Sequence, residues 1–222
     1  MIAETVRLHG TEMPVWPPGQ QVKLLPPPDM GIVNFADRGE YHPALTAAIL
    51  KMEKDPRLHD PRVAGGCGAK VRNPHQWGIP EADLIHARAM TLAAKAFGVD
   101  SVVVDNCWAN VYRKGDYCMP HSHLRATASL IYMLEPGEMA ADDDPGGRLF
   151  FCDPRIPACC DHEDGRVTRL YMPSMEAGSL ILFPALFIHA VNPYGSERPR
   201  ITMSWNVSLN RLPGDPADGW KR

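Results

Sequence analysis

The stretch that decides the fold is a run with strict alternation of polar and apolar side chains: Arg200-Ile201-Thr202-Met203-Ser204-Trp205-Asn206-Val207. In an extended chain successive side chains point to opposite faces, so the four polar residues share one face and the four apolar residues the other. Such a strand buries its apolar face in a core and turns a hydrogen-bonding face the other way. A surface strand with a polar outer face fits the same pattern, and periodicity alone does not separate the two.

Further extended segments precede this run, at residues 102–104, 107–112, 127–134, 148–152 and 179–183. Together with 201–207 they make six candidate strands. Turn-forming residues separate them, as in Lys114-Gly115-Asp116 and Glu135-Pro136-Gly137. This rhythm is typical of an antiparallel sandwich or barrel.

Two helices are predicted before these strands. A first helix is predicted over residues 43–52, because the run Ala44 to Leu50 has strong helix formers. A second helix spans Pro80–Phe97, with Glu81 and Asp83 in its first turn and Gly98 as its stop. The first forty residues are rich in proline and predict short edge strands and loops. Helices followed by a run of strands indicate a mostly β fold with N-terminal helices packed on one face of a double-stranded β-helix, a cupin-like jelly roll.

The chain is long enough to form one core without disulfides, with 222 residues and 45% apolar content. We expect a single domain over 1–222, made of a proline-rich segment with supporting helices (1–98), a jelly-roll core (99–211) and a loose tail (212–222). Six cysteines without paired spacing, including the adjacent Cys159 and Cys160, predict free thiols in a reducing compartment.

The charge and the N-terminus limit the partners and the location. The net charge is −3, with acidic and basic residues nearly balanced, so no basic field is available to hold a nucleic-acid backbone. The N-terminus has no apolar signal core, and no stretch approaches the roughly 20 apolar residues of a membrane helix. We therefore expect a cytoplasmic protein without nucleic-acid or membrane partners, and leave a homodimer open.

Three histidines are candidates for metal ligation. His121 and His123 stand two apart after a turn, and in an extended chain both imidazoles project from one face, where they can converge on one metal. A solvent-exposed pair is the alternative for these two. His189 sits among apolar neighbours, in Leu186-Phe187-Ile188-His189-Ala190-Val191, where it needs either a metal or an ordinary hydrogen-bond partner.

The order of these motifs resembles a known family. The segments, in order, are Asn110 to Asp116, His121-Ser122-His123, Ser129 to Tyr132, Gly147 to Pro154, Ala177 to Pro184, His189, and Arg200 to Asn206. They resemble the core of the 2-oxoglutarate/Fe(II)-dependent oxygenases over residues 106–207. The likeness is greatest to a bacterial and phage-related branch that has His-x-His in place of His-x-Asp. The ordered combination is more specific than any one motif.

The resemblance implies a site and an activity. His121 and His189 match the two iron-binding histidines, and Arg200 matches the arginine that pairs with the distal carboxylate of 2-oxoglutarate. Arg198 is the reserve candidate for that arginine. The implied protein is a non-haem Fe(II) oxygenase that uses 2-oxoglutarate and dioxygen to hydroxylate an organic substrate. Further candidates to bind the co-substrate or substrate are the polar residues Asn110, Tyr112, Thr202, Ser204 and Asn206, which could equally be ordinary polar groups of the barrel.

The sequence departs from the family at His123, where most members have a carboxylate. We take His123 as the third ligand, and Asp116 and Asp153 are the alternatives if a carboxylate is required. An imidazole there raises the formal charge of a ferrous site from +1 to +2, which strengthens its pull on an anionic co-substrate.

Two other functions compete with this hypothesis. One is a three-histidine metal dioxygenase or isomerase of the cupin type, which needs no keto acid. The other is a non-enzymatic metal-binding jelly-roll module, whose metal would have a closed coordination shell. Arg200 is the residue that discriminates the oxygenase from the cupin-type enzyme.

Overall fold

The computed structural model describes residues 4–25, 30–59, 68–138, 146–160 and 169–209. A seven-stranded sheet has the order β3 (Lys23–Leu25), β4 (Met30–Asn34), β10 (Ser179–Pro184), β8 (Ala128–Glu135), β12 (Arg200–Ser208), β6 (Val103–Tyr112) and β5 (Ala69–Arg72). A three-stranded sheet has the order β7 (Cys118–His121), β11 (His189–Val191) and β9 (Leu149–Phe151). A hairpin pairs β1 (Thr5–Leu8) with β2 (Thr11–Pro14).

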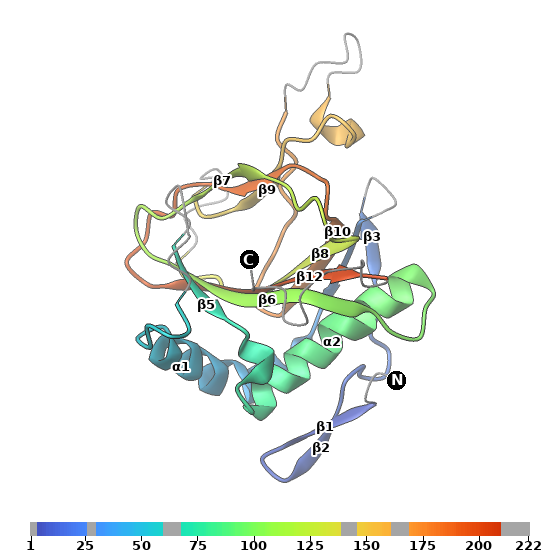
Figure 1. The fold of residues 1–222 in the computed structure, drawn as a ribbon, viewed down its shortest axis with the longest axis vertical. Coiled ribbons are helices and arrows are strands. Elements are labelled where there is room, and N and C mark those ends of the chain that lie inside the picture. Colours follow the sequence, from blue (N-terminus) through green and yellow to red (C-terminus); the bar gives the residue numbers. More distant parts are fainter. Residues whose placement is uncertain (1–3, 26–29, 60–67, 139–145, 161–168, 210–222) are drawn as a thin grey trace.

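Two α-helices and three short 3-10 helices complete the described elements. They are α1 (His42–Met52), α2 (Pro80–Phe97), η1 (Ala36–Glu40), η2 (Pro74–Gln76) and η3 (Pro157–Cys159). Figure 1 shows α1 and α2 beneath one face of the large sheet, while β7 and β9 lie across its other face. The helices and the two sheets therefore make three layers, and the expected jelly roll with helices on one face is confirmed.

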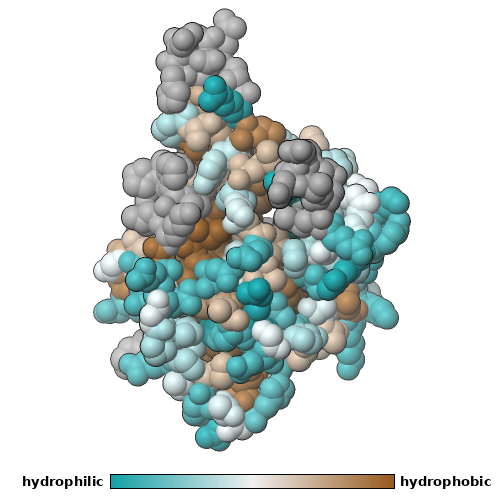
Figure 2. Space-filling view, turned by 180° about the vertical axis from the view of Figure 1, so that it is seen from behind, coloured by the Kyte–Doolittle hydropathy of each residue, from teal (hydrophilic) through white to brown (hydrophobic). Residues whose placement is uncertain are grey.

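Two apolar clusters separate these layers. One lies between the helices and the large sheet and includes Leu45, Ile49 and Trp205. The other lies between the two sheets and includes Tyr112, Phe151 and Phe183. On the face shown in Figure 2, hydrophilic residues cover most of the lower part and hydrophobic residues gather in smaller patches.

Strand β12 holds the large sheet together because it pairs with β6 on one side and β8 on the other, antiparallel in both cases. Its apolar residues belong to the cluster between the helices and the large sheet. Its polar residues are also buried, with Arg200 1%, Thr202 2%, Ser204 3% and Asn206 5% exposed. The surface-strand alternative for this segment is therefore excluded, and its polar face lies inside the protein.

A buried arginine joins the helical layer to the large sheet. The Arg88 side chain on α2 is fully buried, and its guanidinium donates to both carboxylate oxygens of Asp37, at 2.9 and 2.5 Å, and to the hydroxyl of Tyr41 at 2.7 Å. The Tyr41 hydroxyl lies 3.2 Å from the hydroxyl of Tyr132 on β8. This chain of contacts gives the buried cation its counter-charge and fixes α2 against β8.

Most predicted elements are present, with differences in the short ones. The second helix has the predicted bounds, and the predicted strands at 102–104 and 107–112 form one continuous strand, β6. Strands β5, β7 and β11 were not anticipated, and β4 lies inside the sheet between β3 and β10 rather than at an edge. The large sheet thus takes in strands that precede residue 98.

The sequence also predicts cysteines without disulfides and no membrane-spanning stretch. The five described cysteines, at positions 107, 118, 152, 159 and 160, form no disulfide, as expected. Cys67 and the tail at 212–222 lie outside the described residues. Within the described part of the chain, neither helix is long and apolar enough to cross a membrane.

Two histidines packed against the large sheet predict acid destabilisation. Burial lowers the pKa of both His42 and His86 to about 4. The Nδ1 of His86 also accepts a hydrogen bond from the Trp205 indole at 3.1 Å, which requires that nitrogen to be unprotonated. The unfolded chain therefore binds more protons than the folded chain between pH 6.5 and 4. Stability is complete above about pH 6.5 and falls toward pH 4, by roughly 3 kcal/mol per histidine.

Urea unfolding at a series of pH values between 7 and 4 measures this effect. His42→Gln and His86→Gln should each flatten the dependence of the unfolding free energy on pH. The exposed His59→Gln is the control for loss of an imidazole. Slopes in His42→Gln and His86→Gln that equal the wild-type slope would contradict the prediction.

Candidate metal centre

Three imidazoles converge at the edge of the small sheet. His121 ends β7 and His189 begins β11, and the two are cross-strand partners. His123 lies two residues beyond β7, where its backbone N–H donates to the Ala185 carbonyl at 2.7 Å. One ligand atom from each imidazole lies within 4.8 Å of the others. The solvent-exposed alternative for the His121 and His123 pair is therefore wrong.

Backbone carbonyls orient two of these rings. The Nδ1 of His121 lies 2.8 Å from the Met119 carbonyl, and the Nδ1 of His189 lies 2.8 Å from the Phe187 carbonyl. A carbonyl oxygen only accepts, so each Nδ1 carries the proton and each Nε2 keeps its lone pair. This is the usual arrangement of a metal-binding histidine, whose other nitrogen donates to an oxygen that holds the ring in place.

Burial keeps the three imidazoles neutral. It lowers the pKa of His121, lowers that of His123 to about 3, and lowers that of His189 well below its ordinary value. The positive charge of Lys70 lowers all three further. Three neutral imidazoles with free lone pairs are a donor set that suits a divalent transition metal such as Fe(II).

Among the described residues, no carboxylate joins this group. Asp153 is fully buried, but it accepts from the Arg155 guanidinium and from the Ile188 backbone N–H. Asp116 accepts from the Arg113 backbone N–H. Both carboxylates that were alternatives to His123 are thus engaged away from the three histidines.

The histidines line a narrow cavity of about 40 Å³ between the two sheets. Asn110 and Tyr112 are in its wall, as expected from their places on β6. Asn110 is held on both sides of its amide, because it donates to Thr202 and Ser204 at 3.1 and 3.3 Å and accepts from the Trp108 indole at 3.1 Å. Asn110 is therefore a fixed part of the wall.

Thr202 and Asn206 do not line this cavity. Thr202 is occupied by Asn110, and the Asn206 side chain accepts from the Ser129 hydroxyl at 2.8 Å. Ser204, which shares their strand face, lines the cavity in their place. Residues two apart on β12 thus differ in what they contact, although the alternation assigns them all to one face.

Arg200 lies next to the metal cavity, behind Tyr112. Its guanidinium carbon is 5.1 Å from the centre of the Tyr112 ring, and the two residues are cross-strand partners. Its Nε and Nη1 are buried and, in the part of the chain that the structure describes, have no hydrogen-bond partner. Burial lowers the pKa of this guanidinium. A buried cation without a partner is costly, so this position suits an anionic ligand.

Two residues of the cavity wall were missed from the sequence. Lys70 on β5 lies with its ammonium 5.2 Å from the Trp108 ring, and the Trp108 ring is 6.1 Å from that of His123. Trp108 could have been found, because it shares strand parity with Asn110 and Tyr112. Lys70 gave no signal, because none of the predicted strands includes it.

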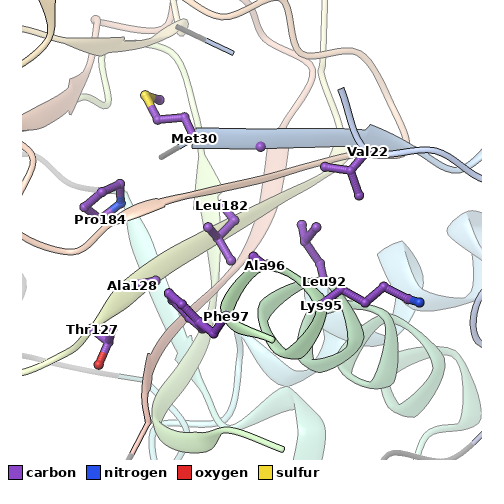
Figure 3. Close-up of a pocket in the computed structure, with 11 residues that line it drawn as sticks. Val22, Met30, Leu92, Lys95, Ala96, Phe97, Thr127, Ala128, Leu182 and Pro184 are labelled. Carbon is purple, nitrogen blue, oxygen red and sulfur yellow. The ribbon is translucent and has the colours of Figure 1, made fainter. Parts of the chain in front are cut away.

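A larger cavity of about 520 Å³ lies away from the histidines, between α2 and strands β4, β8 and β10. Figure 3 shows Ala96 and Phe97 of α2 near Leu182 of β10, with the Lys95 side chain extending outward. Its wall is mostly apolar. No histidine, cysteine or carboxylate is among the described residues that line it, so it offers no chemistry to compare with the histidine site.

Comparisons with known proteins agree with this geometry. Residues 106–206 match a family model described as "Putative 2OG-Fe(II) oxygenase". AviO1 from Streptomyces viridochromogenes Tue57 has a similar structure, with a TM-score of 0.60 and 17% identity over 88% of this chain and 100% of that chain. No curated protein sequence matches this chain.

Two further solved structures share the fold. A Pseudomonas putida prolyl-4-hydroxylase has a TM-score of 0.53 and 16% identity, over 82% of this chain and 89% of that one. The epimerase SnoN from nogalamycin biosynthesis, in complex with Fe3+, alpha ketoglutarate and nogalamycin RO, has a TM-score of 0.59 and 17% identity, over 87% and 89% of the chains. At such identities the likeness is one of fold alone, and these two proteins have different reactions.

We expect His189→Ala to abolish Fe(II) binding, because the variant loses a buried, oriented lone pair and keeps no substitute nearby. His121→Ala should behave alike, and His123→Ala should weaken binding less, since a water can take its place. Equilibrium dialysis under anaerobic conditions, with the iron content measured, tests this. His75→Ala removes a partly buried histidine outside the group and is the control. Stoichiometric iron in a folded His189→Ala variant would remove His189 from the site.

Proposed function

We propose that this chain, whose residues 106–206 match the 2OG-Fe(II) oxygenase family, is an Fe(II)- and 2-oxoglutarate-dependent oxygenase that hydroxylates an organic substrate. His121, His123 and His189 would hold the iron, and Arg200 would bind the distal carboxylate of 2-oxoglutarate. The observation that carries the proposal is the pairing of the two features. A neutral three-histidine group lies near a buried guanidinium, two of whose nitrogens have no hydrogen-bond partner among the described residues.

The iron, when bound, would supply the site for the keto acid and dioxygen, because a facial set of three protein ligands leaves open positions. The residues of the chain orient the ligands and hold the cavity wall. The Met119 and Phe187 carbonyls keep the Nε2 atoms of His121 and His189 pointing inward. The hydrogen-bonded Asn110 keeps one wall of the cavity in place.

Charge favours an anionic co-substrate. The histidines contribute no negative charge, Lys70 adds a positive one, and Arg200 adds another. A keto acid with two carboxylates supplies the missing anions at both ends of the site. Arginine suits the distal end, because its planar fork binds a carboxylate through two parallel hydrogen bonds.

The two rival functions make less use of these features. A three-histidine dioxygenase of the cupin type needs no keto acid, and so leaves Arg200 buried without a partner. A non-enzymatic metal module needs neither Arg200 nor the cavity. Arg198, the reserve candidate for the carboxylate, is half exposed and pairs with Glu135 at 2.8 Å. A single domain, a cytoplasmic location and a homodimer stay predictions.

Replacing Arg200 by Lys should weaken 2-oxoglutarate binding by roughly 1–3 kcal/mol, because the charge remains but the bidentate fork is lost. Iron content should not change. Calorimetric titration of the anaerobic, iron-loaded protein measures the affinity, and Arg198→Lys is the matched control that should bind as wild type does. Equal binding by Arg200→Lys and wild type would shift the proposal to the cupin type.

Turnover gives an independent test of the same function. The iron-loaded protein in air should consume 2-oxoglutarate and release succinate and carbon dioxide in equal amounts, slowly without a primary substrate. His189→Ala should release none. Succinate is measured by chromatography with and without added Fe(II), and an iron-loaded wild type that binds 2-oxoglutarate yet never forms succinate would favour a binding module.

A further inference from the structure

A second cavity, of about 160 Å³, has Arg200 in its wall and shares Leu149 with the wall of the histidine cavity. Arg148 and Arg200 both line it, together with apolar residues that include Met133 and Met175. This volume is close to that of an engineered cavity of about 150 Å³ that holds a benzene molecule. The cavity therefore has room for the end of a small carboxylic acid, and two of its lining residues are cations.

Among the described residues, the wall of this cavity contains no carboxylate that could neutralise either arginine. Within the same described part of the chain, the buried Nε of Arg148 has no hydrogen-bond partner, and neither have Nε and Nη1 of Arg200. Arg200 is buried and Arg148 is partly buried, so water screens the repulsion between their positive charges only in part. An anion between them would remove both costs at once.

The backbone around Arg148 is fixed, so its side chain begins from a defined place. The Arg148 carbonyl accepts from the Asn192 backbone N–H at 3.1 Å, and the Gly147 N–H donates to the Pro193 carbonyl at 3.1 Å. Gly147 has a φ of +68°, and a Cβ added there would lie 3.5 Å from Cδ of Arg200. The turn before β9 thus passes close to Arg200 and brings the second arginine to the same cavity.

We propose that Arg148 is a second carboxylate-binding residue, which together with Arg200 makes the site selective for a keto acid with a distal carboxylate. This inference rests on the proposed function, and deepens it. A carboxylate has about four lone-pair positions, so one guanidinium leaves acceptors that a second can use. A monocarboxylate keto acid such as pyruvate has no group to reach either arginine.

The test compares ligand affinities of the anaerobic, iron-loaded protein by calorimetry. Arg148→Gln should weaken 2-oxoglutarate binding by roughly tenfold to hundredfold, the range for loss of a charge-assisted hydrogen bond. The affinity for pyruvate, the iron content and the thermal midpoint should not change. Arg148→Lys should recover part of the loss. Arg198→Gln, which removes a nearby arginine already paired with Glu135, should bind both acids as wild type does.

The outcomes separate this inference from the proposed function. If wild type binds 2-oxoglutarate and Arg200→Lys weakens it, but Arg148→Gln binds as wild type, the second-arginine inference is overturned and the proposed function stands. Equal weakening for 2-oxoglutarate and pyruvate, or a lowered thermal midpoint without rescue by Lys, would make Arg148 structural and overturn it too. If wild type binds no 2-oxoglutarate, the proposed function fails, and the inference with it.

Discussion

The structure depends on strand β12 being buried on both faces at once. Its apolar side chains pack between the large sheet and the helices, and its polar side chains lie on the opposite face, toward the small sheet. Buried polar groups must find partners, and those of β12 find them across the strand pairs with β6 and β8. Arg200 is the exception. The strand that builds the core therefore also places one buried cation, Arg200, in the interior without a counter-charge among the described residues.

The site is unusual in its charge. Three neutral imidazoles, a lysine and a buried arginine lie close together, and in the described part of the chain no carboxylate faces them. Elsewhere the protein follows the ordinary rule, since buried Arg88 has Asp37. This contrast is one reason for the proposal that a ligand supplies a negative charge at Arg200, because the same fold neutralises the buried Arg88 with a carboxylate of its own.

Sequence reasoning found what local pattern encodes. Helix α2 was predicted with its bounds because its acidic first turn and Gly98 mark both ends, and β12 because its alternation is strict. Strands β7 and β11 were missed because one contains Pro120 and the other has three residues; they exist through pairing with distant partners. Lys70 and Arg148 were not predicted as site residues, because nothing near them in the sequence indicates the cavities that they line.

One packing feature limits how this sequence can vary. Tyr194 fits between two glycines: a Cβ on Gly137 would lie 1.9 Å from its hydroxyl oxygen, and one on Gly147 would lie 2.7 Å from its ring. The same hydroxyl donates to the Arg198 carbonyl. These three positions can change only together, because any side chain at either glycine displaces the ring. In natural variants of this protein, the residues of the adjoining turns should therefore vary, while Gly137, Gly147 and Tyr194 should be retained together.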